Sequence, residues 1–243
     1  MATVLILGAT SDMGRALARG YAARGYNLQL AARQMDDLKT LRSDLKIRYG
    51  IKCSLHTFDA VQTDGHAGFW ASLQTMPDST ILVFGYMQEN TLATEDPGVL
   101  HQTLAVNFTG AVSILNIISR TYKKNGKGSI AGISSVAGER GRGSNYLYGS
   151  AKAGFTAYLS GLRNELHPHS VQVSTILPGF VYTKMTEHLT LPPLLTATPE
   201  QVAEAIIRGL EKGKDVIYVK WFWRWIMFII RNIPESIFKK LKL

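Results

Sequence analysis

Short apolar runs alternate along the chain with longer stretches in which apolar residues recur at helical spacing. Most of the runs have few charges, as expected of strands buried on both faces of a sheet. This alternation predicts an α/β fold with a doubly wound parallel sheet of about seven strands and helices on both faces. The expected strands are residues 3–7, 26–31, 53–57, 80–84, 128–134, 171–176 and 215–219.

Composition indicates one domain and adds little to this picture. The chain has 243 residues, of which 46% are hydrophobic and 19% are charged, as in ordinary globular proteins. No repeat or low-complexity linker divides it, so we expect one domain over residues 1–220 and a distinct segment over 221–243. No secretory signal is recognisable, and Cys53 is the sole cysteine, so a cytoplasmic location is expected.

The first predicted strand is followed by a turn of small residues and then by a helical pattern, in the run VLILGATSDMGRALARG. Gly8 allows a tight turn, and Gly14 lets the backbone approach a ligand closely. The N-terminus of the next helix directs free N–H groups and a positive dipole at an anion. This arrangement predicts a cradle for the pyrophosphate of a dinucleotide.

Tyr148 precedes Lys152 by four residues in a predicted helix, and Ser135 lies thirteen residues before Tyr148. Positions i and i+4 share a helix face, so the ammonium could lower the pKa of the phenol and make it a usable acid. A serine hydroxyl on a neighbouring strand could then bond the substrate oxygen. Taken alone, the Tyr–Lys spacing also fits a surface contact of no function.

Two further motifs fall in register with these, LAVNFTG around Asn107 and ILPGFVYT over residues 176–183. Together the motifs resemble the short-chain dehydrogenase/reductase family, from Val4 to about Val219. The resemblance implies a single-domain Rossmann fold and hydride transfer to a ketone.

The same resemblance implies roles for individual side chains. Ser135 would orient the carbonyl, and Tyr148 would donate the proton. Lys152 would lower the pKa of Tyr148 and hold the nicotinamide ribose, while Asn107 would support a water relay to Lys152.

The sequence departs from the family pattern at two places. Asp12 replaces the middle glycine of the phosphate turn, where an acid would repel the pyrophosphate unless it turned away. We expect Asp12 to cap the helix that begins near Met13. The run ILVFGYM, residues 81–87, stands where the family has Asn-Asn-Ala-Gly, so that only Gly85 leaves room for the cofactor there.

Charge at the end of the second strand favours NADPH over NADH. Arg33 stands where an acid would bind a ribose 2′-hydroxyl, and a guanidinium suits a 2′-phosphate. The alternative is that Arg33 is a solvated loop residue. By resemblance, Asp59 would receive the adenine amine. The full set expected to bind cofactor is Gly8, Thr10, Ser11, Asp12, Met13, Gly14, Arg33, Asp59, Gly85, Asn107, Tyr148, Lys152, Pro178, Gly179, Val181 and Thr183.

The segment from Trp221 to Leu243 holds three of the four tryptophans. Between Lys220 and Leu243 there are six basic side chains and one acid, a net charge of +5 out of +9 for the chain. The apolar stretch is too short to span a bilayer, which takes about 20 residues. It suits a peripheral contact with an anionic membrane surface, at the inner face of the membrane.

A subunit contact is the alternative for this segment, because aromatic residues are favoured in interfaces and family members commonly form homodimers or homotetramers. Nucleic acid is not expected, because the charge lies on an apolar tail and lines no groove. The six histidines show no metal-ligand spacing, and we expect no metal.

Residues 183–199 would cover the substrate and are mostly apolar, which favours a greasy substrate over a free sugar, although their leucines could simply pack on the core. The leading hypothesis is an NADPH-dependent ketoreductase acting on a lipid or lipid-linked sugar, with Tyr148 as general acid. The tail and the opening turn resemble reductases of polyprenylphosphoryl 2-keto-pentoses. The alternatives are a reductase of a soluble keto compound whose tail serves oligomerisation, and an NADPH-sensing binding module.

Overall fold

The computed structural model describes residues 1–241. Seven parallel strands form one sheet in the order β3-β2-β1-β4-β5-β6-β9, and this confirms the predicted fold class. Each predicted strand lies within two residues of its observed bounds. The strands are β1 Thr3–Leu7, β2 Asn27–Ala32, β3 Cys53–Thr57, β4 Ser79–Leu82, β5 Gly128–Ile133, β6 Val171–Leu177 and β9 Val216–Tyr218.

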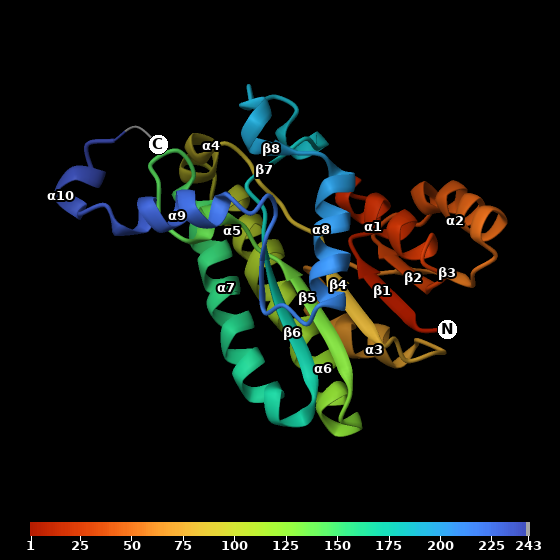
Figure 1. Cartoon of the computed structure of the whole chain (residues 1–243). Coiled ribbons are helices and arrows are strands. Elements are labelled where there is room, and N and C mark those ends of the chain that lie inside the picture. The colour runs from red at the N-terminus through yellow and green to blue at the C-terminus, as the bar shows by residue number, and fades with distance from the viewer. Residues whose placement is uncertain (242–243) are drawn as a thin grey trace.

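Helices cover both faces of this sheet (Figure 1). Alternate side chains of β1 show why, because Val4 and Ile6 enter one core while Leu5 and Leu7 enter the other. The first face carries α1 Asp12–Ala22, α2 Asp36–Tyr49 and α8 Pro199–Glu211, and the second carries α3 His66–Ala71, α6 Gly110–Asn125 and α7 Tyr146–Leu166.

The remaining elements gather at the carboxyl ends of the strands. A two-stranded sheet, β7 Phe180–Val181 with β8 Thr196–Ala197, was not predicted from the sequence. Two short helices, α4 Asn90–Glu95 and α5 Pro97–Leu104, lead through a turn of π-helix, Ala105–Thr109, into α6. The strand order reverses direction between β1 and β4, which is where open α/β sheets bind ligands.

The helical segment Pro97–Asn125 has the length and apolar composition that could cross a membrane. Its buried residues include Ile114, Leu115 and Ile118, and they belong to the core on the second face of the sheet. The core helix of a globular domain has the same composition, so this segment gives no argument for a membrane span.

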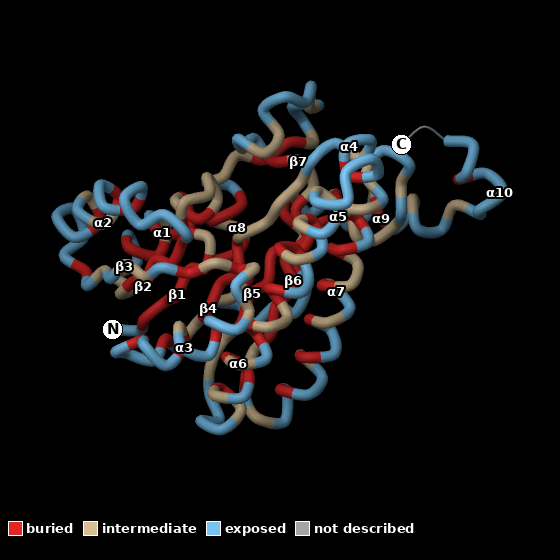
Figure 2. Tube along the Cα trace, turned by 180° about the vertical axis from the view of Figure 1, so that it is seen from behind, coloured by how far each residue is buried: buried red, intermediate tan, exposed pale blue. Residues whose placement is uncertain are grey.

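The C-terminal segment forms two further helices, α9 Trp223–Asn232 and α10 Glu235–Phe238. Trp223 and Met227 are buried in a small third core with Val136 and Leu177. The outer part of this segment extends past the body of the molecule and is mostly exposed (Figure 2). One side of α9 therefore packs at the carboxyl ends of the strands, and the other faces outward.

Candidate active site

The turn after β1 is built for close approach of backbone to a ligand. Gly8 has a φ of +98°, and a Cβ there would lie 2.6 Å from the backbone nitrogen of Phe84. Residues that carry a Cβ rarely adopt that backbone conformation, so only glycine fits. The turn is hydrogen-bonded to β2, because the N–H groups of Gly8 and Ala9 both donate to the carbonyl of Ala31.

Ser11, and not Asp12, caps the following helix. The helix begins at Asp12, and Ser11 accepts a hydrogen bond from the N–H of Gly14 at 3.0 Å. The expectation that Asp12 caps is wrong, because Asp12 is itself the first helical residue and its side chain turns outward. Its carboxylate accepts a bond of 2.9 Å from the N–H of Lys184, in the loop that follows β7.

This geometry fits a dinucleotide phosphate. The carboxylate of Asp12 is engaged by the loop, so it does not oppose an anion at the helix terminus. The N–H groups of Asp12 and Met13 lie in the first turn, where no helical partner exists for them. Two free donors at a helix N-terminus beside Gly8 form an anion cradle.

The predicted cofactor residues gather along one cavity of about 490 Å³. Arg33 and Asp59 lie at the ends of β2 and β3, and Asp59 also accepts a bond of 3.2 Å from the N–H of Val61. Gly14 and Asn107 are the two predicted residues outside the lining. The lining includes Gly8, Thr10, Ser11, Asp12, Met13, Arg33, Asp59, Gly85, Tyr148, Lys152, Pro178, Gly179, Val181 and Thr183.

Asn107 is buried behind the cavity in the turn of π-helix. Its amide accepts from the N–H of Tyr86 at 3.1 Å and donates to the carbonyl of Tyr86 at 2.6 Å. Such turns recur at functional sites. The pair of bonds fixes the irregular segment after β4, where the sequence departs from the family pattern. A Cβ on Gly85 would lie 3.3 Å from Oδ1 of Asn107 and 3.8 Å from Nζ of Lys152.

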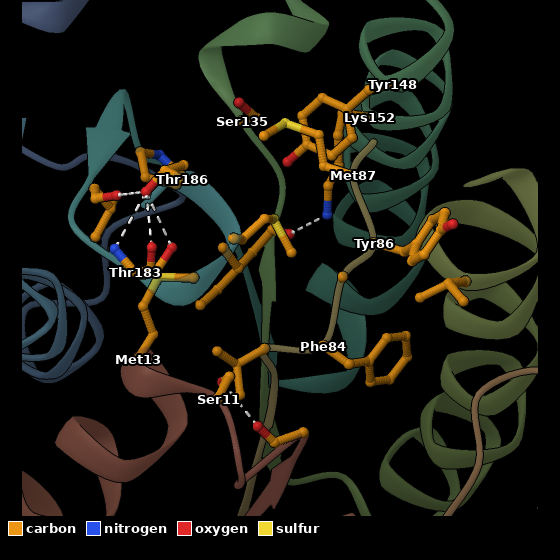
Figure 3. Close-up of a pocket in the computed structure, with 18 of the residues that line it drawn as sticks. Ser11, Met13, Phe84, Tyr86, Met87, Ser135, Tyr148, Lys152, Thr183 and Thr186 are labelled. Carbon is orange, nitrogen blue, oxygen red and sulfur yellow. Dashed lines mark hydrogen bonds between the residues drawn. The ribbon is translucent and has the colours of Figure 1, made fainter. Parts of the chain in front are cut away.

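Three predicted catalytic side chains meet at one end of the cavity. Ser135 follows β5, whereas Tyr148 and Lys152 lie in α7. Figure 3 shows these three side chains at the end of the pocket opposite Ser11 and Met13. The hydroxyl of Ser135 accepts a bond of 3.1 Å from the N–H of Ala137 and lies near enough to the phenol of Tyr148 to affect its pKa. The ammonium of Lys152 donates a bond of 3.0 Å to the carbonyl of Ile133.

The expected lowering of the pKa of Tyr148 by Lys152 is not found. Burial raises the pKa of Tyr148 to about 12, and only the neighbouring hydroxyl of Ser135 opposes this rise. Burial also lowers the pKa of Lys152 to about 8. The Lys152 ammonium is bonded to a backbone carbonyl and lies 5.8 Å from the centre of the Tyr148 ring. Desolvation therefore dominates both groups.

The C-terminal segment contributes a wall that the sequence did not reveal. Trp223 lines the cavity and donates from Nε1 to the carbonyl of Leu195 at 3.1 Å. A Cβ on Gly179 would overlap the indole of Trp223. Gly179 is thus required here for packing against the tail. Further lining residues that the sequence did not indicate are Phe84, Tyr86, Met87, Arg142 and Asn145, whereas Met185, Thr186 and Leu189 belong to the segment 183–199 that was expected to cover the substrate.

The arrangement can hold a dinucleotide along the cavity and place a hydroxyl donor pair at its far end. A neutral phenol with a pKa near about 12 is suited to giving a proton to an oxygen that becomes negative. Within residues 1–241 no group of three or more His, Cys, Asp or Glu side chains could hold a metal ion.

Comparison with known proteins agrees with this geometry. Residues 2–192 match the family described as short chain dehydrogenase. An uncharacterized oxidoreductase of Mycobacterium tuberculosis is 36% identical, with 99% of this chain and 97% of the relative covered. A 3-oxoacyl-acyl-carrier-protein reductase of Bos taurus is 25% identical, with 76% and 77% covered.

A solved structure of a short-chain dehydrogenase from Sphingobium yanoikuyae in complex with NADPH has the same fold. Its TM-score is 0.84 at 21% identity, and the match covers 97% of this chain and 98% of that one.

Proposed function

The chain belongs to the short-chain dehydrogenase family and is an NAD(P)-dependent oxidoreductase, and on this premise we propose that it is an NADPH-dependent ketoreductase. Its substrate is the ketone of a lipid or a lipid-linked sugar. Bound NADPH supplies the hydride. The observation that carries the proposal is the meeting of Ser135, Tyr148 and Lys152 at the end of the cavity that begins at the phosphate cradle.

Tyr148 acts as the general acid in this proposal. Its raised pKa keeps the phenol protonated at neutral pH, so a proton is available for the oxygen that forms when a ketone is reduced. Ser135 lies beside the phenol and donates a hydrogen bond to the same substrate oxygen. Lys152, buried and charged below about pH 8, holds the nicotinamide ribose. Asn107 positions the segment around Tyr86, which borders the nicotinamide end.

NADPH is favoured over NADH by the charge at the adenine end. Arg33 is exposed at the end of β2 and lines the cavity. A guanidinium there can grip a 2′-phosphate with two hydrogen bonds. Asp36 lies three residues further on and forms an ion pair of 2.6 Å with Lys39, so its charge is already balanced.

An apolar substrate is supported by the walls at the reacting end. Met87, Met185, Leu189 and Trp223 all line the cavity. Apolar and flexible side chains of this kind accept an acyl or prenyl chain and offer few partners to a free sugar. The bovine relative named for 3-oxoacyl reduction is consistent with a keto group on a lipid carrier.

The C-terminal segment, residues 221–243, brings this site to a membrane surface. On α9 the outward side is apolar, with Trp225, Phe228 and Ile229 exposed by 56%, 61% and 65%. An outward apolar side is the reverse of what a helix on a globular surface normally presents. Arg224 and Arg231 flank it, and Lys239 and Lys240 follow α10. This combination fits the interface of an anionic bilayer.

In this proposal the enzyme is a peripheral protein at the inner face of the membrane. The inward side of the same helix forms the wall at Trp223, so a lipid chain entering beside α9 would reach the reacting end directly. A homodimer or homotetramer contact through the outward side is the competing use of the segment.

The reaction is tested by following NADPH oxidation with a panel of long-chain and soluble ketones. We expect reduction of long-chain ketones, with NADPH preferred over NADH. The absence of turnover with every ketone, together with intact NADPH binding, would support the sensing module instead.

Membrane contact is tested by sedimentation with phosphatidylglycerol or phosphatidylcholine vesicles. Deleting the tail would also remove Trp223, so we substitute outward residues only, Trp225→Ser with Phe228→Ser. Ile47→Ser is the control, because Ile47 is 87% exposed on the distant helix α2. We expect binding to the anionic vesicles, lost in the double variant and kept in the control. If nothing binds and the double variant dissociates an oligomer, the segment is a subunit contact.

A further inference from the structure

The segment Glu139–Asn145 connects Ser135 to the helix that carries Tyr148, and two of its charged residues hold the tail. Glu139 accepts hydrogen bonds from Oη of Tyr218 at 2.8 Å and from Nη1 of Arg231 at 3.3 Å. Arg140 donates to the carbonyl of Arg231 at 3.0 Å and to the carboxylate of Glu235 at 2.6 Å. Both charges are therefore used within the chain.

Arg142 differs from these neighbours. Over residues 1–241 no acid pairs with it, and its Nε is buried without a hydrogen-bond partner. In the same segment Oδ1 of Asn145 is also buried and unpartnered. Both residues line the cavity. A buried donor or acceptor without a hydrogen-bond partner destabilises the folded protein, and most such groups in folded proteins have a partner.

Burial lowers the pKa of Arg142, which shows that its charge is poorly solvated. A guanidinium keeps its charge nevertheless, so it gains strongly from an anionic partner. Its Nε and one Nη form a fork that matches two oxygens of a phosphate or carboxylate. The unpartnered oxygen of Asn145 can accept a hydrogen bond from a donor such as a hydroxyl group.

The position of the segment assigns this pair to the substrate. The phosphate cradle at Ser11 and Met13 lies at the opposite end of the pocket from Ser135 and Tyr148 (Figure 3). Asn145 is the N-cap residue of the helix that carries Tyr148, and its N–H donates to the carbonyl of Arg142 at 3.1 Å, so both residues lie beside the reacting end. The cofactor's own anions already have the free N–H groups of α1 and the guanidinium of Arg33.

We propose that Arg142 and Asn145 form an anion subsite that binds a phosphate or carboxylate group of the substrate, with a hydroxyl beside it, next to the reacting ketone. The inference rests on the proposed ketoreductase function and narrows its substrate class. The preferred substrate is then an anionic, hydroxylated ketone with an apolar chain, bound more tightly than a neutral long-chain ketone.

The test is a binding measurement on the holoenzyme saturated with NADP⁺, using dodecyl phosphate, dodecanoate and dodecanol. We expect the phosphate or the carboxylate to bind at least about ten-fold more tightly than the alcohol. Arg142→Gln should reduce this ratio about ten-fold, and Arg142→Lys, which keeps the charge but loses the fork, should reduce it less. Asn145→Ala should weaken the binding of 2-hydroxydodecanoate more than that of dodecanoate, because only the former offers a hydroxyl donor beside the anion.

Arg120→Gln is the matched control, because Arg120 is exposed on α6 and remote from the cavity. It should leave the ratio unchanged. The inference is overturned if wild type and Arg142→Gln give the same ratio while both bind NADP⁺. The binding measurement needs no turnover. Failure of every ketone assay would therefore count against the proposed reaction, and the binding ratios would still test the anion subsite. The phosphate and carboxylate arms identify which anion is preferred.

Discussion

The two ends of the pocket are built differently. At the cofactor end, backbone groups fix the geometry, from the turn at Gly8 to the cap at Ser11 and the bond from Lys184 to Asp12. At the reacting end, side chains from distant segments form the walls, and two buried polar atoms, on Arg142 and Asn145, have no partner. The first end thus offers backbone donors to the cofactor, whereas the proposed anion subsite places the unpartnered side-chain atoms at the second.

Tyr148→Phe is expected to have the largest effect, because it should impair the reaction at one end of the pocket and spare cofactor binding at the other. The change removes the transferable proton but keeps the ring, so the rate of ketone reduction should fall about 10³-fold. NADPH affinity, which depends on the other end, should change by less than about three-fold. Fluorescence titration with NADPH and single-turnover rates measure the two quantities. Turnover retained in the variant would remove Tyr148 from the role of acid.

The two sides of α9 offer the next largest contrast. Trp223 is buried at 4% exposure and Trp225 is 56% exposed. Trp223→Ala should lower the free energy of unfolding by about 3–5 kcal/mol, and it should also open the reacting end. Trp225→Ala should change it by less than about 0.5 kcal/mol. Denaturant unfolding checks both, and equal losses would mean that the outward side is packed against something in solution.

At the cofactor end, Arg33→Gln should affect NADPH selectively. Loss of a bidentate charged contact should weaken NADPH about 10- to 100-fold and leave NADH nearly unchanged. Isothermal titration with each cofactor measures the ratio. Equal weakening of both would show that Arg33 does not touch the 2′-phosphate.

A smaller, pH-dependent effect is expected at Lys152. Burial lowers its pKa from 10.5 to about 8, so the ammonium is charged below that pH and neutral above it. If the charge holds the ribose, kcat/KM should fall as pH rises through about 8. Lys152→Arg keeps the charge, so its remaining activity should not fall there. Identical profiles would contradict the assignment.

The same pKa shift changes stability with pH in the opposite direction to kcat/KM. Since the folded pKa of Lys152 lies below the unfolded one, the unfolded chain holds the extra proton between about pH 8 and 10.5. Its contribution to the free energy of unfolding therefore rises with pH across that window. A loss of activity above pH 8 in the wild type would thus not be explained by unfolding through this group.

The sequence predicted more of the cofactor end than of the walls of the reacting end. The strands, the turn at Gly8 and the side chains of α7 were recognised because local periodicity and spacing determine them. The cap was assigned to Asp12 and belongs to Ser11, because the helix begins one residue earlier than its pattern indicated. Cap geometry depends on one backbone torsion, which no periodicity records.

The walls of the reacting end were not predictable in this way. Trp223 meets Gly179 and Leu195 across a distance in sequence that only folding closes. The tail was recognised as apolar and basic, but its division into a buried and an outward side needs the contacts with Val136 and Leu177. Arg142 looked like any loop arginine, because the lack of a partner is visible only in three dimensions.

The most direct test of the account is the initial rate of NADPH oxidation with a long-chain ketone presented in vesicles. The account predicts a rate roughly five-fold or more higher on phosphatidylglycerol than on phosphatidylcholine vesicles, because charge brings the tail to the surface. The difference should vanish in the variant with Trp225→Ser and Phe228→Ser, and persist in Ile47→Ser. Equal rates on both vesicles in the wild type, or no oxidation of NADPH on either, would contradict a membrane ketoreductase.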